Sequence, residues 1–132
     1  IKPVGQIAIV EWGFSFDASA AAAGIEVELC ETGTVFSTVT AAVAQDITKF
    51  DPNAPASTVT LGTAATGYTS SAEGTITAIR QLDGASFYQP TGNYWKQFPL
   101  GREPYGNAAS SIRIRVKAAA AVNMLCYIVW EE

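Results

Sequence analysis

The fold is predicted first from Ser111–Glu132, with the sequence S-I-R-I-R-V-K-A-A-A-A-V-N-M-L-C-Y-I-V-W-E-E. Its first half alternates three apolar residues with three cations, namely Ile112, Ile114 and Val116 with Arg113, Arg115 and Lys117. This period of two predicts a strand with one apolar and one cationic face. After four alanines, Val122–Trp130 is an almost unbroken apolar run, which predicts a strand covered on both faces. A chain that ends on its most buried strand needs earlier strands to cover it.

A second alternating stretch, Ile25–Glu31 (IEVELCE), predicts another strand with an apolar inner face. Glu26 and Glu28 fall on its outer face, which the alternation places in solvent. This acidic face is the natural complement of the cationic face formed by Arg113, Arg115 and Lys117. We expect the two faces to meet, either within one subunit or across a boundary between copies.

The rest of the chain reads as short strands separated by turn-forming residues. Gly13 is expected to mark a bulge in the first strand, and Asp83-Gly84 a turn. We predict strands at 6–16, 58–61 and 75–82, a short helix within 39–47, a connection at 17–24, and long loops at 51–73 and 86–106. The pattern predicts an all-β protein, an antiparallel β-sandwich or jelly-roll-like fold of seven to eight strands.

The length of 132 residues predicts one domain. Pro3 and Gly5 break the first segment, so we expect residues 1–6 to form an N-terminal arm and residues 7–132 a single β-sandwich domain. No apolar run approaches the 18 or so residues of a membrane helix, and we expect no membrane partner.

The net charge is −4, and no basic tract is present, which argues against nucleic acid as a partner. Charged residues make up 15% of the chain, well below the roughly 25% of an average soluble domain. A surface with so few charges suits a protein that spends its life against other protein.

The two cysteines, Cys30 and Cys126, both fall in expected strands. We favour two small buried hydrophobes, and a disulfide between them remains the alternative.

The chain contains no histidine, which removes the common nucleophile systems and leaves few ligands for a transition metal. Glu26 and Glu28 have about the spacing of a glycosidase pair, but their alternation with apolar residues favours a solvated face. We therefore expect a protein that is not an enzyme, with no catalytic residues, metal or cofactor.

The most distinctive loop, 86–106, is rich in aromatic residues and prolines. Tyr88, Tyr94 and Trp95 are candidates for a glycan-stacking platform. We favour the alternative that Trp95 and Phe98 cap one end of the sandwich or lie at a subunit contact, where aromatic residues are enriched. Arg102, at an expected loop tip, is a further candidate contact. A carbohydrate-binding module or receptor-binding head is therefore one functional hypothesis.

Five short strings, taken in order, resemble small β-rich virion structural proteins of tailed bacteriophages, similar to capsid decoration (cement) proteins. They are Glu11-Trp12-Gly13-Phe14-Ser15-Phe16-Asp17, Val27-Glu28-Leu29, Phe98-Pro99-Leu100-Gly101-Arg102-Glu103, Ile114-Arg115-Val116 and Val129-Trp130-Glu131-Glu132. The resemblance implies a protein on the capsid surface of a virion that binds the major capsid protein and its own copies. By analogy with decoration proteins the homo-oligomer would be a trimer.

Overall fold

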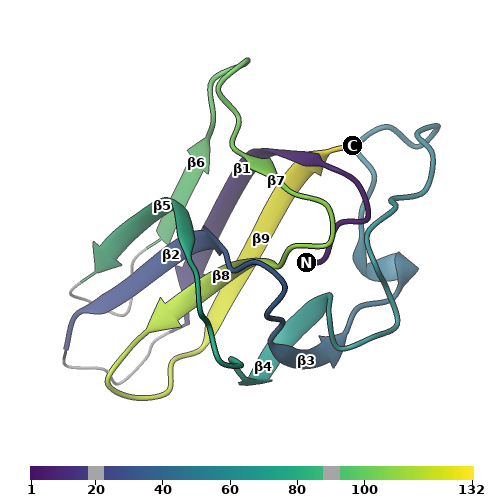
Figure 1. Cartoon of the computed structure of the whole chain (residues 1–132). Coiled ribbons are helices and arrows are strands. Elements are labelled where there is room, and N and C mark those ends of the chain that lie inside the picture. The colour runs from purple at the N-terminus through teal and green to yellow at the C-terminus, as the bar shows by residue number, and fades with distance from the viewer. Residues whose placement is uncertain (18–22, 88–92) are drawn as a thin grey trace.

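The chain was analysed in a computed structural model, which describes residues 1–17, 23–87 and 93–132 (Figure 1). These ranges contain nine strands and a single turn of 3₁₀ helix, so the all-β prediction is confirmed with more strands than the seven or eight expected. The elements are β1 (Ile7–Phe16), β2 (Ile25–Glu31), β3 (Thr38–Ala41), η1 (Ala44–Asp46), β4 (Gly67–Ala72), β5 (Arg80–Phe87), β6 (Asn93–Gln97), β7 (Tyr105–Gly106), β8 (Ile112–Lys117) and β9 (Met124–Glu131).

The strands form two antiparallel sheets that lie face to face as a sandwich. In the first sheet, β6 and β7 pair with one edge of β1, and β9 pairs with its other edge. The second sheet has the order β5-β2-β8. A ribbon of β3 and β4 stands apart from both sheets.

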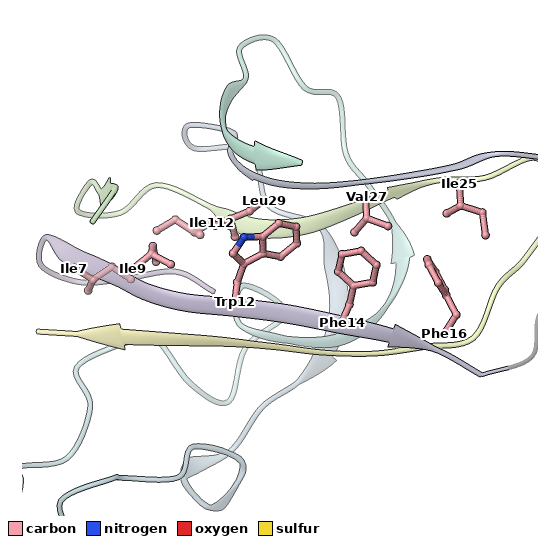
Figure 2. Close-up of a cluster of buried hydrophobic side chains, with 9 residues drawn as sticks. All are labelled: Ile7, Ile9, Trp12, Phe14, Phe16, Ile25, Val27, Leu29 and Ile112. Carbon is pink, nitrogen blue, oxygen red and sulfur yellow. The ribbon is translucent and has the colours of Figure 1, made fainter. Parts of the chain in front are cut away.

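The core lies between β1 of the first sheet and β2 of the second (Figure 2). A bulge between Ile9 and Glu11 adds one residue to β1, so the inward positions change from odd to even numbers along the strand. The nine core side chains are Ile7, Ile9, Trp12, Phe14 and Phe16 of β1, Ile25, Val27 and Leu29 of β2, and Ile112 of β8. Their burial makes β1, and not the last strand, the central element of the domain.

The expected double covering of Val122–Trp130 is wrong. Among the described strands, β9 pairs only with β1, and it therefore lies at an edge of the first sheet. Leu125 and Tyr127 on its outer face are 76% and 43% exposed. An apolar run shows that a strand is compatible with burial, but it does not show that something covers each face.

Three further expectations about the elements are corrected. Gly13 is not at the bulge, which lies two to four residues earlier in β1. Asp83 and Gly84 do not form a turn but lie inside β5, because the Asp83 side chain is held by groups from the first sheet. The strand expected at 75–82 is displaced to Arg80–Phe87.

The regions expected to be helix or loop also differ. Residues 39–47 contain the end of β3 and one 3₁₀ turn in place of the expected helix. A helix confined to so few residues is only marginally stable. No strand forms at 58–61, where the Thr60 amide instead donates to the Lys2 carbonyl. The expected loops contain strands of their own, β4 within 51–73 and β6 and β7 within 86–106.

The first residues, expected to form an arm, pack into the domain. Pro3 is fully buried. The Ile112 amide donates to the Ile1 carbonyl at 2.9 Å, and the Ala109 amide donates to the Pro3 carbonyl at 2.8 Å. These bonds place the start of the chain beside the free edge of β8.

The cysteines have different environments. Cys30 is buried in β2, as expected, whereas Cys126 is exposed on β9. Both thiols are free, so the disulfide alternative is wrong.

Candidate functional site

The predicted acidic and cationic strand faces lie side by side within one subunit. β2 and β8 are neighbours, with Glu26 opposite Lys117 and Glu28 opposite Arg115. The Lys117 ammonium lies 3.0 Å from the Glu26 carboxylate, and the Arg115 guanidinium lies 3.1 Å from Glu28. We call these four residues the charged ladder.

Glu28 is not the solvated residue that its alternation predicted, because it is only 3% exposed. Arg115 spans from Glu28 to Glu73, a residue that follows β4 and lies over the outer face of β2. The hydrogen bonds to Glu73 and then to Glu28 raise the pKa of Arg115 above its usual range. Glu28 therefore holds two cations in place, which gives the glutamate pair a structural role.

Arg113 extends the covering of this face. Its guanidinium donates to the backbone carbonyls of Glu73, at 2.9 Å, and of Val35. Two loops, one before β3 and one after β4, are thus fastened onto the outer face of the second sheet. Burial lowers the pKa of Arg113, as expected for a cation taken partly out of water.

A partly buried carboxylate joins the two sheets from inside. Asp83 of β5 accepts hydrogen bonds from Trp12 Nε1 at 2.9 Å, from the Tyr94 hydroxyl at 2.8 Å and from Lys96 Nζ at 2.8 Å. Burial acts to raise the pKa of Asp83, but the three donors outweigh it and hold that pKa below its usual range. We call this group the Asp83 clamp.

Tyr94 and Trp95, two members of the expected aromatic platform, lie on opposite faces of β6 because successive side chains of a strand alternate. Tyr94 points into the sandwich, where its ring packs against Trp12 and Phe14 with centroid distances of 5.3 and 5.7 Å. Trp95 points outward and is 66% exposed. Tyr88 lies outside the described residues. The two adjacent aromatic residues therefore cannot act on one ligand.

A different aromatic group gathers on the outer face of the first sheet. The register aligns Trp95, Gly13 and Tyr127 in one row across β6, β1 and β9, with Asn93, Ser15 and Leu125 in the next row. A shallow hollow of about 200 Å³ lies between these side chains. We call these six residues the aromatic face.

Tyr127 is fixed in place on this face. A Cβ atom added to Gly13 would lie 2.8–2.9 Å from the edge of the Tyr127 ring, so the ring crosses β1 where only a glycine leaves room. The Tyr127 hydroxyl donates to Glu11 Oε1 at 2.6 Å. This hydrogen bond, with burial, raises the pKa of Tyr127 to about 12, so the phenol stays protonated.

Arg102 lies on a second feature, a projection between β6 and β7 formed by residues 98–104 (Figure 1). Both of its ends bond to β1, through Phe98 N to Val10 O at 2.8 Å and Ile9 N to Pro104 O at 2.9 Å. A turn closed by Arg102 N and Pro99 O at 2.9 Å forms its tip, where Leu100 is 97% exposed. Gly101 takes the positive φ of 77° that this turn requires.

A larger depression, of about 430 Å³, lies beside Glu31 and Arg80. Its polar groups bond to one another, with Arg80 Nε 2.6 Å from Glu31 Oε2 and Asn107 Nδ2 2.9 Å from Glu31 Oε1. The depression therefore offers a ligand few free polar partners.

Within the described ranges, no three Cys, Asp or Glu side chains gather as a metal site would require. Nor does that part of the chain contain a helix that could span a membrane. No protein-family model, curated protein or solved structure matches this chain. The likeness to phage structural proteins therefore rests on the short strings of residues quoted above.

Proposed function

We propose that this protein is a non-enzymatic structural component of a tailed-phage virion, which binds the capsid surface and stabilises it as a decoration protein. The observation that carries the proposal is the projection, with Leu100 at its tip. Leu100 is the most exposed large apolar residue among the described ones. An apolar side chain held out on a short, braced turn suits insertion into a pocket on another protein.

The rest of the domain supports the same use. Both ends of the projection are bonded to β1, which supplies five of the nine core side chains, so its tip is presented from a rigid base. A docking element that is ordered before it binds loses less conformational entropy on binding. Arg102 beside the tip offers a cation to an acidic rim. The partner would be the major capsid protein, and the oligomer a trimer by analogy with decoration proteins.

The test uses virions of the phage that encodes the chain, together with capsids prepared without it. The native mass of the purified protein tests whether the oligomer is a trimer. The protein should be found on intact particles, and added protein should restore heat resistance to the bare capsids. Absence from particles, or bare capsids that are equally resistant to heat, would overturn the proposal.

Leu100→Asp is the decisive variant, and Phe50→Asp is its control because Phe50 is 83% exposed in a different loop. We expect Leu100→Asp to abolish binding to bare capsids and Phe50→Asp to leave it unchanged. Equal binding by both variants would show that the projection does not dock.

A further inference from the structure

The aromatic face presents two rings to solvent on one side of the first sheet. Trp95 is 66% exposed and Tyr127 is 43% exposed, and they lie on either side of Gly13. Solvent-exposed tryptophan and tyrosine side chains combine a large apolar surface with a polar group, which suits ligands that are themselves both apolar and polar. Sugars have this character, since a pyranose ring has an apolar face and a rim of hydroxyl groups.

One of the two rings is ordered before any ligand arrives. Gly13 leaves room for the Tyr127 ring to cross β1, and the Glu11 carboxylate holds its hydroxyl at 2.6 Å. Contacts within the protein therefore fix the two side-chain torsions of Tyr127. A ligand that stacks on the Tyr127 ring does not have to order that side chain first.

The groups that the register places around the rings include hydrogen-bonding side chains beside the apolar Leu125 and Val129, and none carries a positive charge. Asn93 and Gln97 flank Trp95 on the same face of β6, and Ser15 lies beside Gly13. Of the residues that the register places on this face of the described strands, the charged ones are Glu11 and Glu131, both acidic. Amide, hydroxyl and carboxylate groups bond well to sugar hydroxyls, whereas two carboxylates disfavour an anionic ligand.

We propose that the aromatic face is a binding site for neutral glycans, with pyranose rings stacked on Trp95 and Tyr127. The hollow between the rings, about 200 Å³, is lined by Ser15 and Asn93 as well as by Leu125 and the rings themselves. The site uses none of the residues of the projection, and it holds whether or not the protein decorates a capsid.

The first experiment applies the intact protein to an immobilised array of neutral and of sialylated or sulfated glycans. We expect retention on neutral glycans only. Trp95→Ala and Tyr127→Ala should each weaken the affinity about tenfold or more, because each removes one stacking surface. Thermal unfolding of both variants checks that they remain folded.

Titration with cellohexaose, xylohexaose and mannohexaose, followed by tryptophan fluorescence, gives a second readout. A tryptophan fluorescence change that saturates with added oligosaccharide in the wild type, and is absent in Trp95→Phe, would support stacking on Trp95. The proposal is overturned by retention of no neutral glycan, by binding that both alanine variants keep, or by capture of protein partners alone through this face. Leu100→Asp separates the two proposals, since it should lose capsid binding and keep glycan binding, and Trp95→Ala should do the reverse.

Discussion

The two outer faces of the sandwich invert the usual relation between polarity and exposure. On the second sheet, the outer side chains of β2 are charged, yet Glu28 and its neighbours lie under loops fastened by Arg113 and Arg115. On the first sheet, the outer side chains include Trp95, Leu125 and Tyr127, and they are exposed.

The difference distinguishes a face that holds the fold together from a face that is open to solvent. Buried charges that pair with each other hold layers together and offer little to a ligand. Exposed aromatic residues gain nothing for stability by their exposure, and contiguous groups of them mark binding surfaces. The faces can be distinguished by measuring stability and binding separately for variants of each.

Outside the apolar core, the largest effect on stability is expected on the charged face. Glu28→Ala removes the buried carboxylate that Arg115 and Lys117 share and leaves them the more exposed Glu73 and Glu26, which should lower the free energy of unfolding by about 2–3 kcal/mol. Urea denaturation of the variant and the wild type measures this loss of stability. Glu26→Ala is the control, since Glu26 is half-exposed and its single pair should contribute no more than about 0.5–1 kcal/mol. Equal losses in the two variants would contradict the view that this face is structural.

The Asp83 clamp, between the two faces, should have the next largest effect. Asp83→Asn weakens three hydrogen bonds to a carboxylate and should cost about 2 kcal/mol. Because the folded-state pKa of Asp83 lies below its unfolded value of about 4, its contribution is complete above pH 4 and is lost as the pH falls through the folded-state pKa. Stability measured against pH should therefore fall less steeply in acid for Asp83→Asn than for the wild type.

Gly13→Ala tests whether the aromatic face is preorganised. The new methyl group would collide with the Tyr127 ring, which can swing away, so we expect a stability loss below about 1 kcal/mol. Glycan affinity should fall as far as in Tyr127→Ala, because the ring no longer lies across β1. Array binding and thermal unfolding measure the two effects. Unchanged glycan binding would show that the position of the ring does not matter.

The smallest effect on stability is expected at Trp95. Trp95→Ala should change the free energy of unfolding by no more than about 0.5 kcal/mol, because the side chain is mostly exposed. Trp12→Ala, in the core, should cost about 3–5 kcal/mol by comparison. A large loss in Trp95→Ala would mean that the aromatic face stabilises the fold and is not reserved for a ligand.

The fold class could be predicted from the sequence because apolar and polar residues alternate along β1, β2 and β8. This alternation is typical of strands in a sheet with one buried and one outer face. The same alternation anticipated that Glu26 and Glu28 would meet Arg115 and Lys117. It could not show that a third layer would cover Glu28, since that depends on where the loops around Val35 and Glu73 lie.

The aromatic face was largely missed for a related reason. Trp95 was among the candidates, but Gly13 and Tyr127 are 114 residues apart and become neighbours only through the register of β1 and β9. The detectable signal was a glycine inside a strong strand, which indicated a close approach without identifying the partner. Tyr94 was misplaced because adjacent residues on a strand point to opposite faces.

The projection also affects how this protein behaves when many copies are crowded together. Exposed strand edges invite other chains to add a strand, and a bare apolar sheet increases the risk of aggregation. Residues 98–104 split that edge of the first sheet into runs of five and two residues, β6 and β7. Neither run is long enough to serve as a good template, so on that edge the same segment that we propose for docking also limits uncontrolled growth of the sheet from copy to copy.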